Sequence, residues 1–91
     1  TEKEIRQIVL LQIGSVQKML AGNGVNLELT NEAIEFIAKA GYDPEFGARP
    51  VKRAIQRYLL NDLSKKMLAQ DVDRNKPIIV DSFGESLVFR N

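Results

Sequence analysis

The sequence contains no cysteine and no histidine, and these absences exclude several classes of function. Without cysteine there is no disulfide framework and no thiolate nucleophile. Without either residue there is no Cys/His zinc site and no catalytic triad that uses an imidazole. The lack of cysteine also fits a reducing compartment, so we expect a cytoplasmic protein.

Long apolar runs are missing as well. The longest is Ile8-Val9-Leu10-Leu11, far short of the ~20 residues that a membrane-spanning helix needs. No basic-then-apolar segment of the signal-peptide kind opens the chain, so we expect no membrane contact. The chain starts at Thr1 and enters a helical pattern at once. This start leads us to expect a fragment of a longer chain.

What is present is the composition of one small folded domain. Of the 91 residues, 44% are hydrophobic and 27% are charged, and the formal net charge is +1. This balance favours a single domain over residues 1–91, with one modest core and neither a polybasic tail nor a disordered segment.

Apolar periodicity predicts the order of the elements. A helical stripe covers residues 2–21 and stops at Gly22-Asn23-Gly24, and an alternating strand pattern follows at 25–29. Thr30 is a good N-cap for a short helix that Gly41 would end at the C′ position.

The second half of the chain predicts one more helix and two strands. Pro50 suits the first position of a helix that runs to Leu68. Residues 77–80 and 87–89 predict two strands around a turn at 82–86, most simply a hairpin. The order α-β-α-α-β-β therefore predicts an α+β fold, with three helices packed on a small mixed three-stranded sheet. The connection through two helices permits the first strand to pair in parallel with a later one.

Residues for catalysis or metal binding are few. The serines lack a base, and Asp71, Asp73 and Asn75 resemble the start of a calcium loop without its glycine or distal glutamate. A solvated loop is the better interpretation, and no metal site is expected. Neither G-x-x-x-x-G-K-[ST] nor G-x-G-x-x-G occurs. The chain by itself is therefore not expected to be an enzyme or to bind a nucleotide well.

A run of cations without acids occupies residues 46–61. It contains Arg49, Lys52, Arg53 and Arg57, and the three arginines are spaced i, i+4, i+8, which would align them on one face of the third helix. Cations at a helix N-terminus are unfavourable by roughly 0.3–1 kcal/mol each when exposed. A phosphate there would satisfy both the cations and the free N–H groups of the first turn. A solvated basic face and an anion-facing Arg49 both remain open.

The turn before these cations, GYDPEFGARP, favours the second interpretation. Gly47-Ala48 leaves little bulk beside Arg49, so another group can approach the backbone closely. Gly47 also fits a turn position whose φ is open only to glycine. We expect Tyr42 and Phe46 to pack this turn onto the core rather than to stack on a ligand.

The stretch G-Y-D-P-E-F-G-A-R-P-V-K-R-A-I-Q, followed by Leu59-Leu60-Asn61-Asp62-Leu63-Ser64, resembles the C-terminal small subdomain of Clp-family AAA+ ATPases. The resemblance covers essentially the whole chain and is strongest to the second ATPase module of the ClpB disaggregases; a protease-partner Clp ATPase is the alternative parent. It implies a nucleotide-sensing lid of a stress-response chaperone that disaggregates and unfolds proteins with ATP.

The resemblance also implies roles for particular residues. Arg49 corresponds to the sensor-2 arginine that contacts the phosphates of ATP or ADP, while Ala48 and Ile8 would border the adenine pocket and Gly47 would allow close approach. The Walker motifs, sensor 1, the arginine finger and the pore loop belong to a large subdomain that this chain lacks. The nucleotide would therefore be bound mainly by that absent large subdomain.

The same resemblance implies the partners. These are the large subdomain of the same chain, neighbouring protomers of a homohexamer, and unfolded or aggregated client proteins reached through the full protein. Rotation of the small subdomain would couple ATP hydrolysis to its neighbours in the ring.

Two functions of other classes remain as alternatives. One is a nucleic-acid-binding module that uses the basic face of helix 50–69, although the near-zero net charge and the lack of an aromatic platform argue against it. The other is a pure oligomerisation domain in which Arg49 pairs with an acidic residue of a neighbour.

Overall fold

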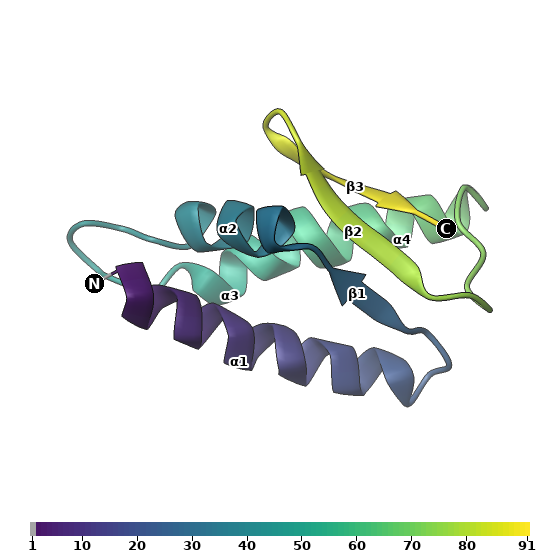
Figure 1. The fold of residues 1–91 in the computed structure, drawn as a ribbon, viewed down its shortest axis with the longest axis horizontal. Helices are drawn as coiled ribbons and strands as arrows, with labels where there is room; N and C mark the ends of the chain where they lie inside the picture. Colours follow the sequence, from purple (N-terminus) through teal and green to yellow (C-terminus); the bar gives the residue numbers. More distant parts are fainter. Residues whose placement is uncertain (1) are drawn as a thin grey trace.

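Helices and a small sheet enclose one apolar core in the computed structural model, which describes residues 2–91 (Figure 1). Helix α1 spans Glu2–Ala21 and helix α2 spans Asn31–Ala40. A third long helix consists of α3 (Val51–Ala54), the π-helical segment η1 (Ile55–Leu60) and α4 (Asn61–Leu68). The strands are β1 (Leu27–Leu29), β2 (Ile78–Phe83) and β3 (Ser86–Arg90).

The sheet has the order β1-β2-β3, which confirms the mixed topology predicted from the sequence. Strand β1 runs parallel to β2 with Leu27 opposite Ile78, and β2 and β3 form an antiparallel hairpin. The hairpin loop contains only Gly84 and Glu85. The φ of Gly84 is +63°, as the first position of a type II′ turn requires, so both strands are longer than predicted.

Strand β1 is shorter than the 25–29 segment predicted. Val25 remains buried, but its N–H donates to the carbonyl of Leu20 at the end of α1. Together with the bond from the Gly24 N–H to the Ala21 carbonyl, this is a Schellman motif, with Gly24 in the left-handed conformation. Val25 therefore belongs to the helix cap.

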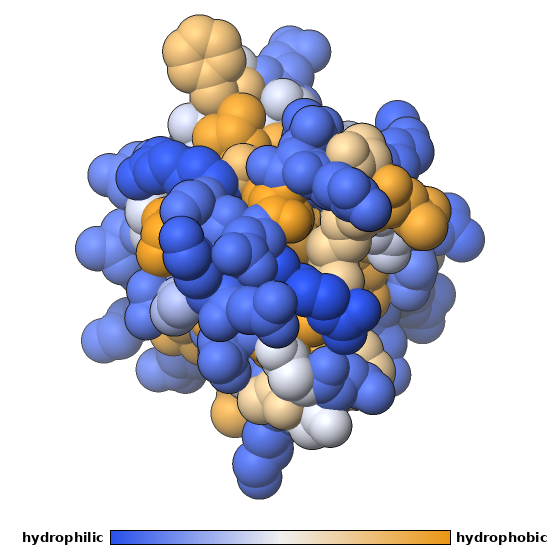
Figure 2. All heavy atoms as spheres, turned by 90° about the vertical axis from the view of Figure 1, so that its right-hand side faces the viewer, coloured by the Kyte–Doolittle hydropathy of each residue, from blue (hydrophilic) through white to orange (hydrophobic). Residues whose placement is uncertain are grey.

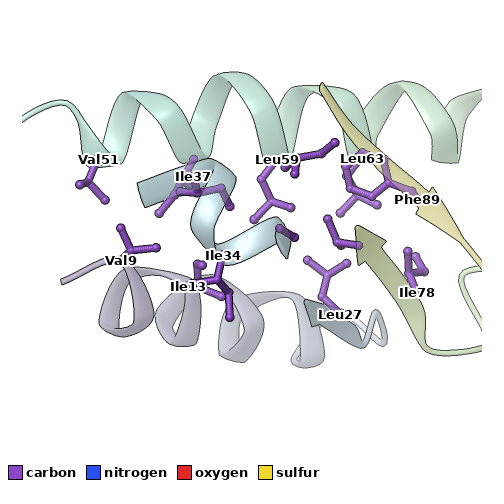
Figure 3. Close-up of a cluster of buried hydrophobic side chains, with 14 of the residues drawn as sticks. Val9, Ile13, Leu27, Ile34, Ile37, Val51, Leu59, Leu63, Ile78 and Phe89 are labelled. Atoms are coloured by element: carbon purple, nitrogen blue, oxygen red, sulfur yellow. The ribbon is translucent and has the colours of Figure 1, made fainter. Parts of the chain in front are cut away.

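The core lies between α1 and the long third helix (Figure 3). Val9 and Ile13 of α1 face Val51 and Leu59 across the cluster, and α2 fills the space between them (Figure 3). Ile78 of β2 and Phe89 of β3 close the far end. No polar or charged side chain is buried among the described residues, so apolar contact is what joins the layers.

The π-helical segment is the one feature of the helices that the sequence did not predict. The inward residues of the long helix recur every four positions: Val51, Ile55, Leu59, Leu63 and Met67. On an α-helix of 3.6 residues per turn, each four-residue step advances the side chain about 40° too far. A wider turn over residues 55–60 offsets this drift and keeps the stripe on the core.

The end of α2 is held by a steric contact. Gly41 is the C-cap, with φ −93°, so it does not adopt the left-handed conformation expected of a C′ glycine. Glycine is required instead because a Cβ there would meet Val51 at the start of α3. The contact sets the position of the chain that carries the 42–50 turn.

Candidate functional site

The turn that precedes α3 is built around Asp43. Its side-chain Oδ1 accepts hydrogen bonds from the backbone N–H groups of Glu45 (2.7 Å) and Phe46 (3.0 Å). Asp43 and Gly47 also exchange two backbone hydrogen bonds, of 2.9 and 2.7 Å. The φ of Gly47 is +63°, which confirms that this position needs glycine for its conformation. These hydrogen bonds therefore hold the backbone of residues 43–47 in a defined conformation.

The long helix begins one residue later than predicted. Pro50 is the N-cap, with φ −76° and ψ 2°, and Val51 is the first helical residue. No side chain caps this end, and the first turn contains no acid. Arg49 thus lies before the helix, and only Arg53 and Arg57 are on it, so the predicted row of three arginines on one helix face is wrong.

The cations at this helix start have no acidic partner in the described chain. Arg49, Lys52 and Arg53 are exposed. The ion pairs found among residues 3–91 involve other cations: Arg6 with Glu35, Lys66 with Asp71, and Arg90 with Asp81. The helix end therefore combines positive side chains with a positive dipole end, an arrangement that favours an anion.

Arg49 is positioned by an aromatic ring. Its guanidinium carbon lies 5.2 Å from the centroid of the Phe46 ring, within the range of a cation–π contact. Arg57 makes a similar contact with Tyr58, also at 5.2 Å. Stacking restrains the Arg49 side chain while its N–H donors stay available.

The expectation that Tyr42 and Phe46 pack the turn onto the core is wrong. Tyr42 is 44% exposed and Phe46 is 52% exposed. Asp43 and Gly47 already stabilise the turn through hydrogen bonds, so no aromatic wedge is required. Sequence reasoning missed Phe46 as the residue that holds Arg49; an aromatic residue three positions before an arginine in a tight turn is the signal that was available.

The other two predicted site residues, Ala48 and Ile8, lie on different elements. Ala48 is half-buried and packs against the core, whereas Ile8 is 38% exposed on α1. Its neighbour Val9 lies across the core from Val51 (Figure 3). A Cβ built on Gly47 would meet no atom within 4 Å, so the space in front of the turn is open.

A surface groove lies away from these residues. It has a volume of about 700 Å³ and lies between the start of α1 and the end of α2. Its lining includes Lys3, Arg6, Lys39 and Tyr42, but not Gly47, Ala48, Arg49 or Ile8. The predicted site residues therefore do not belong to this groove.

Hydrogen bonds and an ion pair occupy the carboxylates of the acidic loop. Asp73 accepts a 2.9 Å hydrogen bond from the N–H of Asn75, and Asp71 pairs with Lys66. Within the described residues no three acidic side chains cluster in a way that would hold a metal ion. None of the described helices has the length and apolar character to cross a membrane.

Comparison with known proteins gives one consistent result. Residues 1–80 match the family model of the C-terminal, D2-small domain, of ClpB protein. The chain is 76% identical to the chaperone protein ClpB of Bacteroides thetaiotaomicron over 91 residues, which is 100% of this chain and 11% of that protein. It is 52% identical to ClpB of Porphyromonas gingivalis over 91 residues, 100% of this chain and 10% of that protein. The chain spans about a tenth of the length of these relatives.

Proposed function

The chain belongs to the family of ClpB C-terminal D2-small domains, and from this premise we propose that it is the nucleotide-sensing lid of an ATP-dependent protein-disaggregating chaperone. In this proposal the chain is one part of a longer ATPase, and the large subdomain of that protein holds most of the ATP or ADP. Arg49 contacts the nucleotide phosphates from the side of the lid.

The observation that carries the proposal is the state of Arg49. The residue is exposed, stacks on Phe46 and has no acidic partner in the described chain. It also lies beside a helix start whose first turn contains no acid. Guanidinium groups bind phosphate oxygens through two parallel N–H donors, and a helix N-terminus supports the same charge. The arrangement is thus half of an anion site whose other half lies outside this chain.

The residues around Arg49 are suited to contact the parts of a nucleotide other than its phosphates. Ala48 and the exposed part of Ile8 supply small and aliphatic surface for the adenine ring. Gly47, with open space before it, lets another backbone approach. These are proposed contacts with a nucleotide bound on the large subdomain.

The proposed mechanism is coupling between nucleotide and domain position. Loss of the γ-phosphate changes what Arg49 contacts, and the lid then rotates relative to the large subdomain. In a homohexamer this rotation is transmitted to a neighbouring protomer and finally to an unfolded or aggregated client protein. Because the 42–50 turn is rigidly hydrogen-bonded, a force on Arg49 reaches α3 and the core.

The test is Arg49→Ala in the full-length protein, with Arg57→Ala as the matched control. Both arginines are exposed and stack on an aromatic ring at 5.2 Å, but only Arg49 precedes the helix start. We expect Arg49→Ala to weaken nucleotide binding or slow ATP hydrolysis by about tenfold or more, since hydrogen bonds to charged groups contribute ~1.5–3 kcal/mol. Arg57→Ala should remain near wild type.

Three outcomes are informative. Unchanged ATP affinity, turnover and disaggregation in Arg49→Ala would contradict the lid proposal. An unchanged nucleotide response combined with altered sedimentation of the protein would favour the oligomerisation alternative. Salt-dependent binding of DNA or RNA that weakens in Arg57→Ala would favour the nucleic-acid alternative.

A further inference from the structure

The carboxylate of Asp43 holds the backbone of its own turn. Its Oδ1 accepts the N–H groups of Glu45 (2.7 Å) and Phe46 (3.0 Å). Pro44, which follows Asp43, has no N–H, so these are the first two backbone donors after Asp43. A side chain that accepts N–H groups a few residues ahead forms an Asx-turn, which fixes the backbone that follows it. One oxygen of Asp43 therefore sets the position of the Phe46 backbone.

Phe46 is in turn joined to Arg49 by two contacts. The backbone carbonyl of Phe46 accepts the N–H of Arg49 at 3.3 Å. The ring of Phe46 lies 5.2 Å from the guanidinium carbon of Arg49, which is a cation–π contact. The first contact restrains the backbone of Arg49 and the second restrains its side chain. A change in the position of Phe46 therefore moves both parts of Arg49.

The negative charge of Asp43 is not paired with Arg49. The ion pairs found in the described part of the chain join other groups, such as Lys66 of α4 with Asp71. The end of α4 faces the viewer in Figure 2, where the surface is mostly hydrophilic. The 42–50 turn forms the loop at the opposite end, at the left of Figure 1. Asp43 thus holds the residue on which Arg49 stacks and does not compete with an anion for the guanidinium.

We propose that Asp43 is a positioning residue for Arg49 and acts through Phe46. The carboxylate holds the backbone of Phe46, and Phe46 holds Arg49 in the orientation in which it meets a phosphate. Because all of these contacts lie within residues 43–49, the orientation exists before an anion arrives, and less conformational entropy is lost on binding. The inference rests on the proposed function for the identity of the anion, whereas the positioning itself needs no nucleotide.

Two substitutions separate the hydrogen bonds of Asp43 from its charge. Asp43→Asn keeps a side-chain oxygen that can accept the two N–H groups and removes the charge, whereas Asp43→Ala removes both. Glu45→Ala is the matched control. It removes an exposed carboxylate from the same turn but keeps the backbone N–H that Asp43 accepts.

NMR of the 91-residue chain tests the positioning without a nucleotide. The ring current of Phe46 shifts the side-chain protons of Arg49 upfield, and Phe46→Ala gives their shifts without the ring. We expect Asp43→Ala to lose most of this upfield shift, and Asp43→Asn and Glu45→Ala to keep it. Methyl resonances of Ile78, which is buried at the far end of the core, report whether each variant is folded. An unchanged Arg49 shift in folded Asp43→Ala would overturn the proposal, and so would loss of the shift in Asp43→Asn.

Nucleotide binding by the full-length protein tests the consequence for Arg49. We expect Asp43→Ala to raise the dissociation constant for ATP by about threefold or more, and Asp43→Asn to restore binding. In an Arg49→Ala background, Asp43→Ala should cause no further loss, because a residue that acts through another has no effect once that other residue is removed. A further loss in the double variant would overturn the proposal. Unchanged binding in Arg49→Ala, together with an Arg49 shift that depends on Asp43, would refute the lid function and still support the positioning.

Discussion

Gly41 and Val51 lie so close together that a Cβ atom at position 41 would be 2.9 Å from both Cα and Cγ2 of Val51. Gly41 ends α2, and Val51 is the first residue of α3. This contact therefore fixes where the helix start next to Arg49 sits relative to the core. Because one of the two atoms is backbone, a rotamer change alone cannot relieve the overlap.

We predict that Gly41→Ala destabilises the domain by ~1–3 kcal/mol, the usual cost of adding a methyl group to a tightly packed contact. Gly14→Ala is the control. A Cβ on Gly14, inside α1, would meet no atom within 4 Å, and alanine there should stabilise by ~0.5–1 kcal/mol. Urea unfolding measures the stability of both variants. Equal stability of the two would show that the contact with Val51 does not exclude a methyl group at position 41.

We predict that Gln70→Gly stabilises the domain. Gln70 has φ +58° and occupies the left-handed position of a Schellman motif after α4, where its N–H donates to Met67 and that of Asp71 donates to Lys66. A non-glycine residue in this conformation destabilises the folded state by ~1–2 kcal/mol. Glycine removes this strain, but its greater conformational entropy in the unfolded chain offsets part of the gain. Thermal unfolding should show a melting temperature higher by several degrees.

Gly24 provides the reverse experiment, because it occupies the same position of the Schellman motif after α1. A Cβ there would meet no atom within 4 Å, so Gly24→Ala probes conformation without packing. We predict a loss of ~1 kcal/mol in urea unfolding. If neither Gln70→Gly nor Gly24→Ala changed the free energy of unfolding, the left-handed conformation at these helix ends would not contribute to stability.

We predict that Asp81 makes stability depend on acid pH. The N–H of Ser82 and the hydroxyl of Thr30 donate to its carboxylate, and with Arg90 they hold its pKa below the ordinary 3.8, against the opposing effect of partial burial. A lowered folded-state pKa contributes stability that is present above pH 3.8 and lost as pH falls through the folded value.

Unfolding free energies of wild type and Asp81→Asn, measured from pH 6 to pH 2, test this prediction. The advantage of wild type should shrink below pH 3.8, because the other carboxyl groups titrate alike in both proteins. A carboxyl resonance of Asp81 that titrates at or above 3.8 in the folded protein would refute it.

We predict that Phe46 positions Arg49 without touching the nucleotide. In the full-length protein, Phe46→Ala should raise the nucleotide dissociation constant about two- to fivefold, because exposed cation–π contacts contribute ~0.5–1 kcal/mol. Phe46→Tyr should restore binding, since tyrosine keeps the ring. Tyr42→Ala removes an exposed aromatic side chain from the same turn and should have no effect. Equal losses in Phe46→Ala and Tyr42→Ala would point to the turn as a whole rather than to the contact with Arg49.

The sequence predicted the layers of the fold because the patterns that specify them are local. Thr30 does accept the N–H of Ala33 as an N-cap, and the third helix does end at Leu68. What the sequence did not predict depends on contacts between distant residues. The need for glycine at position 41 arises from Val51, and the π-helical turn arises because Ile55 and Leu59 must face one core.

The candidate site was predicted in part. Gly47 was identified correctly as a conformational glycine, because a turn motif between two helices is readable from the residues themselves. The exposure of Tyr42 and Phe46 was not predicted, because an apolar side chain is not always buried and its hydrophobicity alone does not show whether it reaches the core. The helix start was predicted one residue early, at Pro50 instead of Val51, because the boundary is the least certain feature of any helix pattern.

The parallel pairing of β1 with β2 has a consequence for how the chain folds during synthesis. Leu27 pairs with Ile78 across roughly fifty residues, and β2 is the central strand of the sheet. All three helices are therefore made before the strand that completes their core exists. Until β2 emerges from the ribosome, the inward faces of α1, α2 and the long helix stay partly exposed. Native structure at the Arg49 turn, which rests on that core through Val51, is then a late event in the life of the chain.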